Sequence, residues 1–178
     1  MARKFLMNAE GVHCRGLDPN NPCYAFYKKF YFFYGTLMDP ATLAKVLGRS
    51  DQPVLRPAKI TGYRCMMWGP YPALIDDRSG GTVHGIAYEV QSPEEVELLE
   101  AYETERYYDT GCSITLEDGT RVSGRTFKWY GKRDDLVEGA FSLEDWVAGK
   151  LLECGSEAPK KAFIYSEPGG QSTNRKFA

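Results

Sequence analysis

Tyr31-Phe32-Phe33-Tyr34-Gly35-Thr36-Leu37 is the stretch of this 178-residue chain that decides its fold. The aromatic run favours a β-strand over residues 30–34, and the glycine that follows ends it. Glycine at that point permits a positive φ angle and a close approach of the backbone to a ligand. Successive N–H groups at such a turn would form a pocket for negative charge. Taken alone, the stretch is more simply a strand–turn–helix junction.

A second stretch, Leu98-Leu99-Glu100-Ala101-Tyr102-Glu103, is predicted to end a helix. Ser92 caps that helix, Pro93 suits its first position, and Glu95 completes a capping box. The apolar face then consists of residues at helical spacing, namely Val96, Leu99 and Tyr102.

Glu103 therefore follows the point where the apolar face stops, and we expect it at the rim of the core. Its expected neighbours are aromatic: Tyr102, Tyr107 and Tyr108. A carboxylate partly buried among such rings is suited to proton transfer near neutral pH. In isolation, a solvated helix end shared with Glu105 is the simpler interpretation.

Strand signals occupy most of the remaining domain. We predict one long or two short strands over 54–67, further strands at 73–75 and 83–90, and a hairpin from 114 to 130 that turns at 117–119. Residues 69–72 are predicted to form an irregular loop and 76–81 a turn.

Two more helices complete the pattern. One starts at Asp39-Pro40 and ends at Gly48, and the other runs from Ser142 through Leu151 to Gly155. This order predicts an α+β fold, a compact mixed, mostly antiparallel β-barrel with a few short helices. We assign the domain to residues 30–155, with an N-terminal extension at 1–29 and a polar C-terminal tail at 156–178.

Composition narrows the function classes. A formal net charge of −2, with basic residues in pairs at most, gives no reason to expect nucleic-acid binding. The five cysteines show no metal-ligand spacing and fit free thiols in a reducing compartment. We expect no metal, no cofactor and no membrane segment, and a cytoplasmic location.

Other chemical signals are weak. There is no Gly-x-Ser-x-Gly nucleophile elbow and no phosphate-binding glycine loop. His84 lies in a predicted strand and is expected to be a hydrogen-bonded core residue. The run Trp68-Gly69-Pro70-Tyr71-Pro72 could equally form a pocket wall or a packed loop.

The ordered set of Tyr34–Leu37, Val83–Val90, Leu99–Glu103 and Tyr107 resembles the gamma-glutamylcyclotransferase-like family, in its avirulence-induced-gene-like branch. The resemblance covers most of residues 30–153. It implies a mixed barrel with a central cavity, and enzymes that release 5-oxoproline from gamma-glutamyl amides. It also implies Glu103 as general acid and base, with substrate bound by Tyr34, Gly35, Thr36, Leu37, Pro72 and Tyr107.

The chain departs from the family pattern near the acid. Glu100 stands in place of aspartate, Thr104 in place of a common glycine, and Asp109 where an arginine is common. These departures leave two alternatives open. One is an enzyme of the same fold acting on a different, pathway-specific substrate, and the other is a non-catalytic module that binds a small molecule or a partner. The oligomeric state is not predicted.

Overall fold

A five-stranded closed barrel forms the centre of the computed structural model, which describes residues 26–149. Its strands follow the order β1 (Lys29–Phe33), β5 (Thr82–Val90), β2 (Arg56–Thr61), β6 (Tyr107–Leu116) and β7 (Arg121–Trp129). All neighbours pair antiparallel except β1 and β7, whose parallel pairing closes the barrel. The predicted α+β fold with a mixed, mostly antiparallel barrel is confirmed.

Alternation along β1 divides the core into two parts, because successive side chains of a strand point to opposite faces. Phe32 belongs to a buried cluster in the barrel interior that includes Ile60, Ala87 and Ile114. Tyr31 and Phe33 belong to a second cluster outside the barrel, which contains Leu43, Leu99 and Trp129. The two faces of β1 therefore contact different layers, one the interior of the barrel and the other the layer under the helices.

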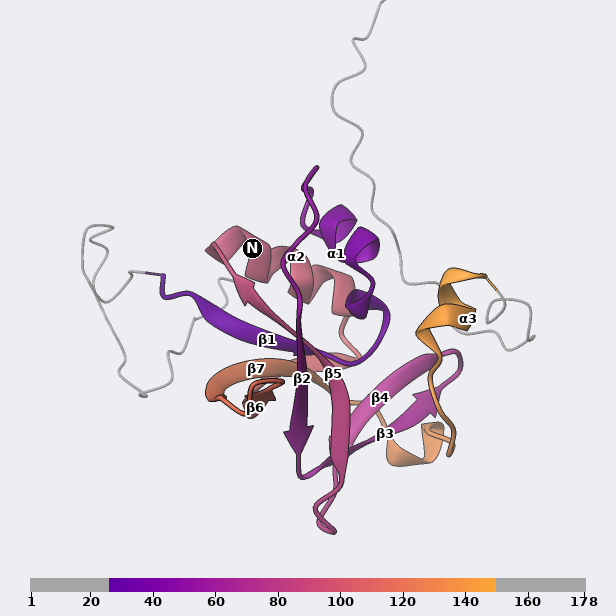
Figure 1. The fold of residues 1–178 in the computed structure, drawn as a ribbon. Helices are drawn as coiled ribbons and strands as arrows, with labels where there is room; N and C mark the ends of the chain where they lie inside the picture. Colours follow the sequence, from indigo (N-terminus) through magenta and orange to yellow (C-terminus); the bar gives the residue numbers. More distant parts are fainter. Residues whose placement is uncertain (1–25, 150–178) are drawn as a thin grey trace, which may run out of the picture.

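Two helices cover one side of the barrel: α1 (Pro40–Val46) and α2 (Pro93–Glu103) lie together there (Figure 1). Both begin as predicted, with the Asp39 carboxylate accepting from Thr42 N and the Ser92 hydroxyl accepting from Glu95 N. Leu99, which is fully buried, anchors α2 on the barrel. This docking directs the end of α2 toward the end of β1.

A separate two-stranded sheet lies beside the barrel and consists of β3 (Tyr63–Trp68) and β4 (Tyr71–Asp76) (Figure 1). The expectation of a loop through residue 72 was wrong, because Tyr71 and Pro72 pair with Trp68 and Met67. Proline is tolerated here because β4 has a strand partner on one edge only, so a missing N–H costs no ladder bond on the other edge.

Short elements complete the described chain: two 3-10 turns, η2 (Thr36–Met38) and η3 (Arg133–Asp135), and the helix α3 (Leu143–Val147). The last helix is shorter than predicted, since Gly149 adopts a φ angle of 76° just beyond it. Leu151 and Gly155 lie outside the described residues, as do most of the predicted extension and all of the predicted tail. Over residues 26–149, no helix is long and apolar enough to cross a membrane.

Candidate active site

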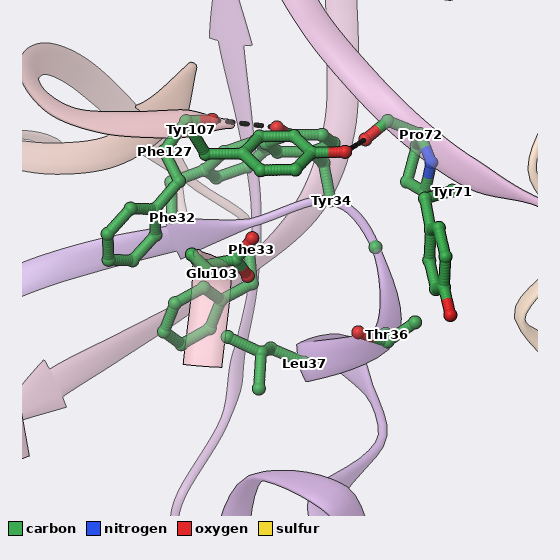
Figure 2. A pocket seen from close by; sticks show the side chains of 11 residues that line it. Phe32, Phe33, Tyr34, Thr36, Leu37, Tyr71, Pro72, Glu103, Tyr107 and Phe127 are labelled. Atoms are coloured by element: carbon green, nitrogen blue, oxygen red, sulfur yellow. Dashed lines mark hydrogen bonds between the residues drawn. The ribbon is translucent and has the colours of Figure 1, made fainter. Parts of the chain in front are cut away.

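A pocket opens where β1 ends, at the meeting point of the barrel, the last turn of α2 and the β3–β4 sheet. It holds about 340 Å³ of space between its atoms, including the open mouth. Most of its surface is aromatic, and Figure 2 shows the lining side chains arranged around the carboxylate of Glu103. Among the described residues, the lining consists of Phe32, Phe33, Tyr34, Gly35, Thr36, Leu37, Tyr71, Pro72, Glu103, Tyr107 and Phe127.

Every site residue predicted from the sequence lies in this lining. Tyr34 and Gly35 follow β1, and Thr36 and Leu37 begin η2. Pro72 comes from β4, Tyr107 from β6 and Glu103 from α2. The sequence separation is large, since Tyr34 and Glu103 are 69 positions apart (103 − 34). The structure thus brings the predicted residues together, while the role of each remains a prediction.

Position 35 requires a glycine, but for a reason that the sequence did not predict. Its φ angle is −135°, so a left-handed conformation is not the reason. A Cβ atom built on Gly35 would lie 2.9 Å from Cγ of Pro72. Glycine is therefore required here because β4 packs closely against the loop. This packing also narrows the pocket on that side.

The loop after Gly35 presents main-chain N–H groups near the pocket. In the 3-10 turn η2, Met38 N donates to Gly35 O at 2.9 Å and Asp39 N donates to Thr36 O at 3.3 Å. Within residues 26–149, the amides of Gly35, Thr36 and Leu37 donate to no main-chain carbonyl outside a strand or helix ladder. Such groups can stabilise a carboxylate or a developing oxyanion.

Glu103 is the last residue of α2 and is half-buried. Among the lining residues from positions 26–149 it is the only charged one. Its neighbour Tyr102 ties this helix end to the loop, because the Tyr102 hydroxyl and Thr36 Oγ1 are hydrogen-bonded at 2.8 Å. The end of α2 that carries Glu103 is therefore tied to the loop after β1, and both line the same pocket.

Thr104 follows Glu103 in an unusual backbone conformation. Its φ and ψ angles are 66° and 179°, a region that is almost exclusive to glycine. Within the described chain it is the one non-glycine residue with a positive φ. Glycine, which is common at this position in the family that the sequence resembles, would adopt these angles without strain, whereas threonine adopts them under strain.

Two tyrosines fix the opposite wall through hydrogen bonds (Figure 2). The Tyr34 hydroxyl donates to Phe127 O at 2.7 Å, and the Tyr107 hydroxyl donates to Pro72 O at 3.2 Å. Burial raises the pKa of both hydroxyls far above the ordinary range, and the negative charge of Glu103 adds to each shift. Both side chains therefore stay neutral across physiological pH.

Three residues considered in the sequence lie elsewhere. Tyr108 is exposed and contacts Tyr130, away from the pocket lining. His84 is exposed on β5, so the expectation of a core histidine was wrong. Asp109 accepts from the Tyr31 hydroxyl at 2.8 Å and forms an ion pair with Arg125, so an arginine from β7 is its partner.

Sequence reasoning missed four lining residues: Phe32, Phe33, Tyr71 and Phe127. Phe32 and Phe33 were assigned to the strand only, although the strand end opens into the pocket. Tyr71 was considered only as part of the aromatic loop. Phe127 carries no local signal, because its place depends on the pairing of β7 with β1.

Among residues 26–149 there is no group of three or more histidine, cysteine, aspartate or glutamate side chains that could hold a metal ion. The described lining offers a carboxylate, neutral tyrosine hydroxyls and main-chain amides. This set suits proton transfer beside a stabilised negative charge.

Comparison with known proteins agrees with the fold. Residues 31–148 match the family model described as "Gamma-glutamyl cyclotransferase, AIG2-like". Protein AIG2 C of Arabidopsis thaliana is 29% identical over 118 residues, covering 65% of this chain and 70% of the relative. A solution structure from Arabidopsis thaliana is 25% identical with a TM-score of 0.58, covering 72% of this chain and 80% of that one. An AIG2-like protein from Mus musculus is 18% identical with a TM-score of 0.50, covering 66% and 88% of the two chains, and shows the shared fold.

Proposed function

Because the chain belongs to the AIG2-like gamma-glutamyl cyclotransferase family, we propose that it cyclises a small gamma-glutamyl amide to 5-oxoproline and a free amine. One observation supports this most strongly. The single charged side chain of the pocket lining, Glu103, shares that lining with Gly35, Thr36 and Leu37 at the end of β1.

The reaction needs a base, an acid and a fixed conformation. The α-amine of the substrate attacks its own side-chain carbonyl carbon, a new C–N bond closes the five-membered ring, and the original amide C–N bond breaks. Glu103 accepts a proton from the α-ammonium and passes it to the departing amine. The ring nitrogen loses a second proton as the lactam forms, and the released amine takes it up and leaves as an ammonium, so the two protons lost by one nitrogen equal the two gained by the other. The substrate supplies the nucleophile itself.

The remaining wall residues bind and orient. The amides of the Gly35 loop hold the substrate carboxylate or the developing oxyanion. The rings of Tyr34 and Tyr107, locked by their hydrogen bonds, keep the substrate folded with the amine near the carbonyl. The narrow aromatic pocket also excludes water from the reacting atoms.

The test is release of 5-oxoproline from a panel of gamma-glutamyl compounds by the wild type and two variants. Glu103→Gln should keep the fold and lose about 10²–10⁴-fold in turnover, the usual contribution of acid–base catalysis. Glu105→Gln is the matched control, because this exposed side chain lies two residues away and outside the pocket lining. Thermal melts confirm that both variants are folded.

Three results would contradict the proposal. Binding of gamma-glutamyl compounds without turnover by the wild type would favour a binding module. Turnover of another substrate class would favour a different enzyme of the same fold. Unchanged turnover in Glu103→Gln would remove the assigned acid and base.

A further inference from the structure

The aromatic wall of the pocket continues beyond the residues that line it. Tyr71 lines the pocket, and its ring centroid is 6.3 Å from that of Trp68, which does not line it. Trp68 in turn packs on Trp129 at 5.1 Å, and Trp129 contacts the pocket residue Tyr107 at 5.5 Å. Trp68 is therefore held from two sides, directly outside the pocket.

Arg106 places a positive charge on this outer wall. Its guanidinium carbon is 5.6 Å from the centre of the Trp68 ring, a cation–π distance. The backbone is fixed as well, because Arg106 O accepts from Tyr130 N at 2.8 Å. The stacked position limits the freedom of a side chain that is otherwise long and flexible.

The charge of Arg106 is not neutralised within the described part of the chain. Its guanidinium makes no hydrogen bond or ion pair with residues 26–149, whereas Arg49 and Arg125 each pair with a carboxylate. Arg106 lies three positions after Glu103, so a negative charge inside the pocket is followed by a positive charge on its outer wall. This order matches a substrate with an ammonium group inside and an anionic group outside.

We propose that Arg106, stacked on Trp68, binds an anionic group on the leaving amine and so selects gamma-glutamyl amides whose amine carries a carboxylate. The inference rests on the proposed function, because it assumes that the gamma-glutamyl part faces Glu103. The leaving amine then extends past Tyr71 toward Arg106. Arg106 is a specificity-determining residue in this arrangement and takes no part in proton transfer.

The test compares two amides that differ only in one carboxylate, gamma-glutamylalanine and gamma-glutamylethylamide. The wild type should have a kcat/KM about 3- to 5-fold higher for gamma-glutamylalanine, the range expected of an exposed ion pair. The difference should lie in KM, because the ion pair forms equally in the ground state and the transition state. It should shrink in high salt, which screens exposed charges.

Arg106→Gln should abolish this preference by raising KM for gamma-glutamylalanine only. Arg78→Gln is the matched control, since Arg78 is exposed and also lacks an ion pair within residues 26–149, but lies in the turn between β4 and β5. The control should keep the preference. Equal losses for both amides in Arg106→Gln, or equal kcat/KM values in the wild type, would overturn the inference and leave the proposed function standing.

A binding experiment separates the two proposals. Calorimetric titration of both amides into Glu103→Gln, with and without Arg106→Gln, measures recognition without turnover. Tighter binding of gamma-glutamylalanine that depends on Arg106 supports the subsite even if the wild type releases no 5-oxoproline. Equal affinities for both amides would overturn it.

Discussion

Gly35 and Pro72 lie so close together that a Cβ atom on Gly35 would be 2.9 Å from Cγ of Pro72. This contact joins the loop after β1 to the β3–β4 sheet, and both residues line the pocket. The proline ring has little freedom to move aside, so any side chain at position 35 must displace the wall of the site.

We therefore expect Gly35→Ala to lower both stability and turnover. Overpacking of this kind costs typically about 1–3 kcal/mol in the free energy of unfolding, and the displaced loop amides would misalign the substrate. Urea unfolding and 5-oxoproline release measure the two effects. Gly111→Ala is the control, because a Cβ atom there meets nothing within 4 Å and its φ angle is not positive. Equal behaviour of the two variants would contradict the packing argument.

The strained backbone of Thr104 leads to a stabilising prediction. Thr104→Gly should raise the free energy of unfolding by about 1 kcal/mol, since relief of strain at φ 66° outweighs the larger entropy of unfolded glycine. Turnover should be kept, because the backbone path after Glu103 is unchanged. Thr120→Gly, at an exposed hairpin position with an ordinary φ, should destabilise instead. A lower melting temperature for Thr104→Gly would show that the threonine side chain itself stabilises the turn.

Local signals predicted most of the fold. The capping residues Asp39 and Ser92 start α1 and α2 where expected, and the aromatic run of β1 is buried on both faces. Convergence of the Gly35 loop and Glu103 was also predicted, from the order of motifs rather than from either motif alone. These features depend on short-range patterns that the sequence displays directly.

Features set by distant pairing were not predicted. Barrel closure depends on Phe30 pairing with Gly124, a parallel contact with no local signature. The orientation of His84 depends on the register of β5, because a shift of one residue exchanges the two faces of a strand. The place of Arg106 on Trp68 likewise requires β6 and β3 to meet in space.

Alkaline pH should destabilise the protein through its buried hydroxyls. Burial raises the pKa of Tyr102 to about 12, from about 10 in the unfolded chain. The neutral form is thus favoured in the folded state, so this contribution is complete below about pH 10 and is lost as the pH rises toward 12. Burial also raises the pKa of the Cys65 thiol to about 12, which extends the effect down to about pH 9.

Urea unfolding between about pH 8 and pH 11.5 checks this prediction. Between its pKa in the unfolded chain and its pKa in the folded protein, each such group lowers the free energy of unfolding by about 1.4 kcal/mol per pH unit. Tyr102→Phe should remove one such slope, whereas Tyr130→Phe should not, because the Tyr130 side chain is 74% exposed. A stability that stays constant to pH 11.5 would show that these hydroxyls ionise as readily in the folded state as in the unfolded chain.

Glu95 should be a stability residue remote from the pocket lining. Its carboxylate is surrounded by donors: the Tyr88 hydroxyl at 2.9 and 3.0 Å, Gln91 N at 2.8 Å and Arg49 Nη1 at 3.2 Å. Glu95→Gln replaces one accepting oxygen with a donating amide, so at least one buried donor loses its partner. The expected loss is about 1–3 kcal/mol in the free energy of unfolding, with turnover unchanged because Glu95 does not line the pocket.

Glu97→Gln provides the control for this change in the same helix. Its side chain is exposed, so neutralising it should alter stability by no more than about 0.5 kcal/mol. Urea midpoints of the two variants at neutral pH give the comparison, with 5-oxoproline release measured on the same samples. If the midpoint of Glu95→Gln equalled that of Glu97→Gln, the network joining Arg49, β5 and α2 would contribute nothing to stability. If Glu95→Gln lost turnover at unchanged stability, the site would extend along α2 beyond its last turn.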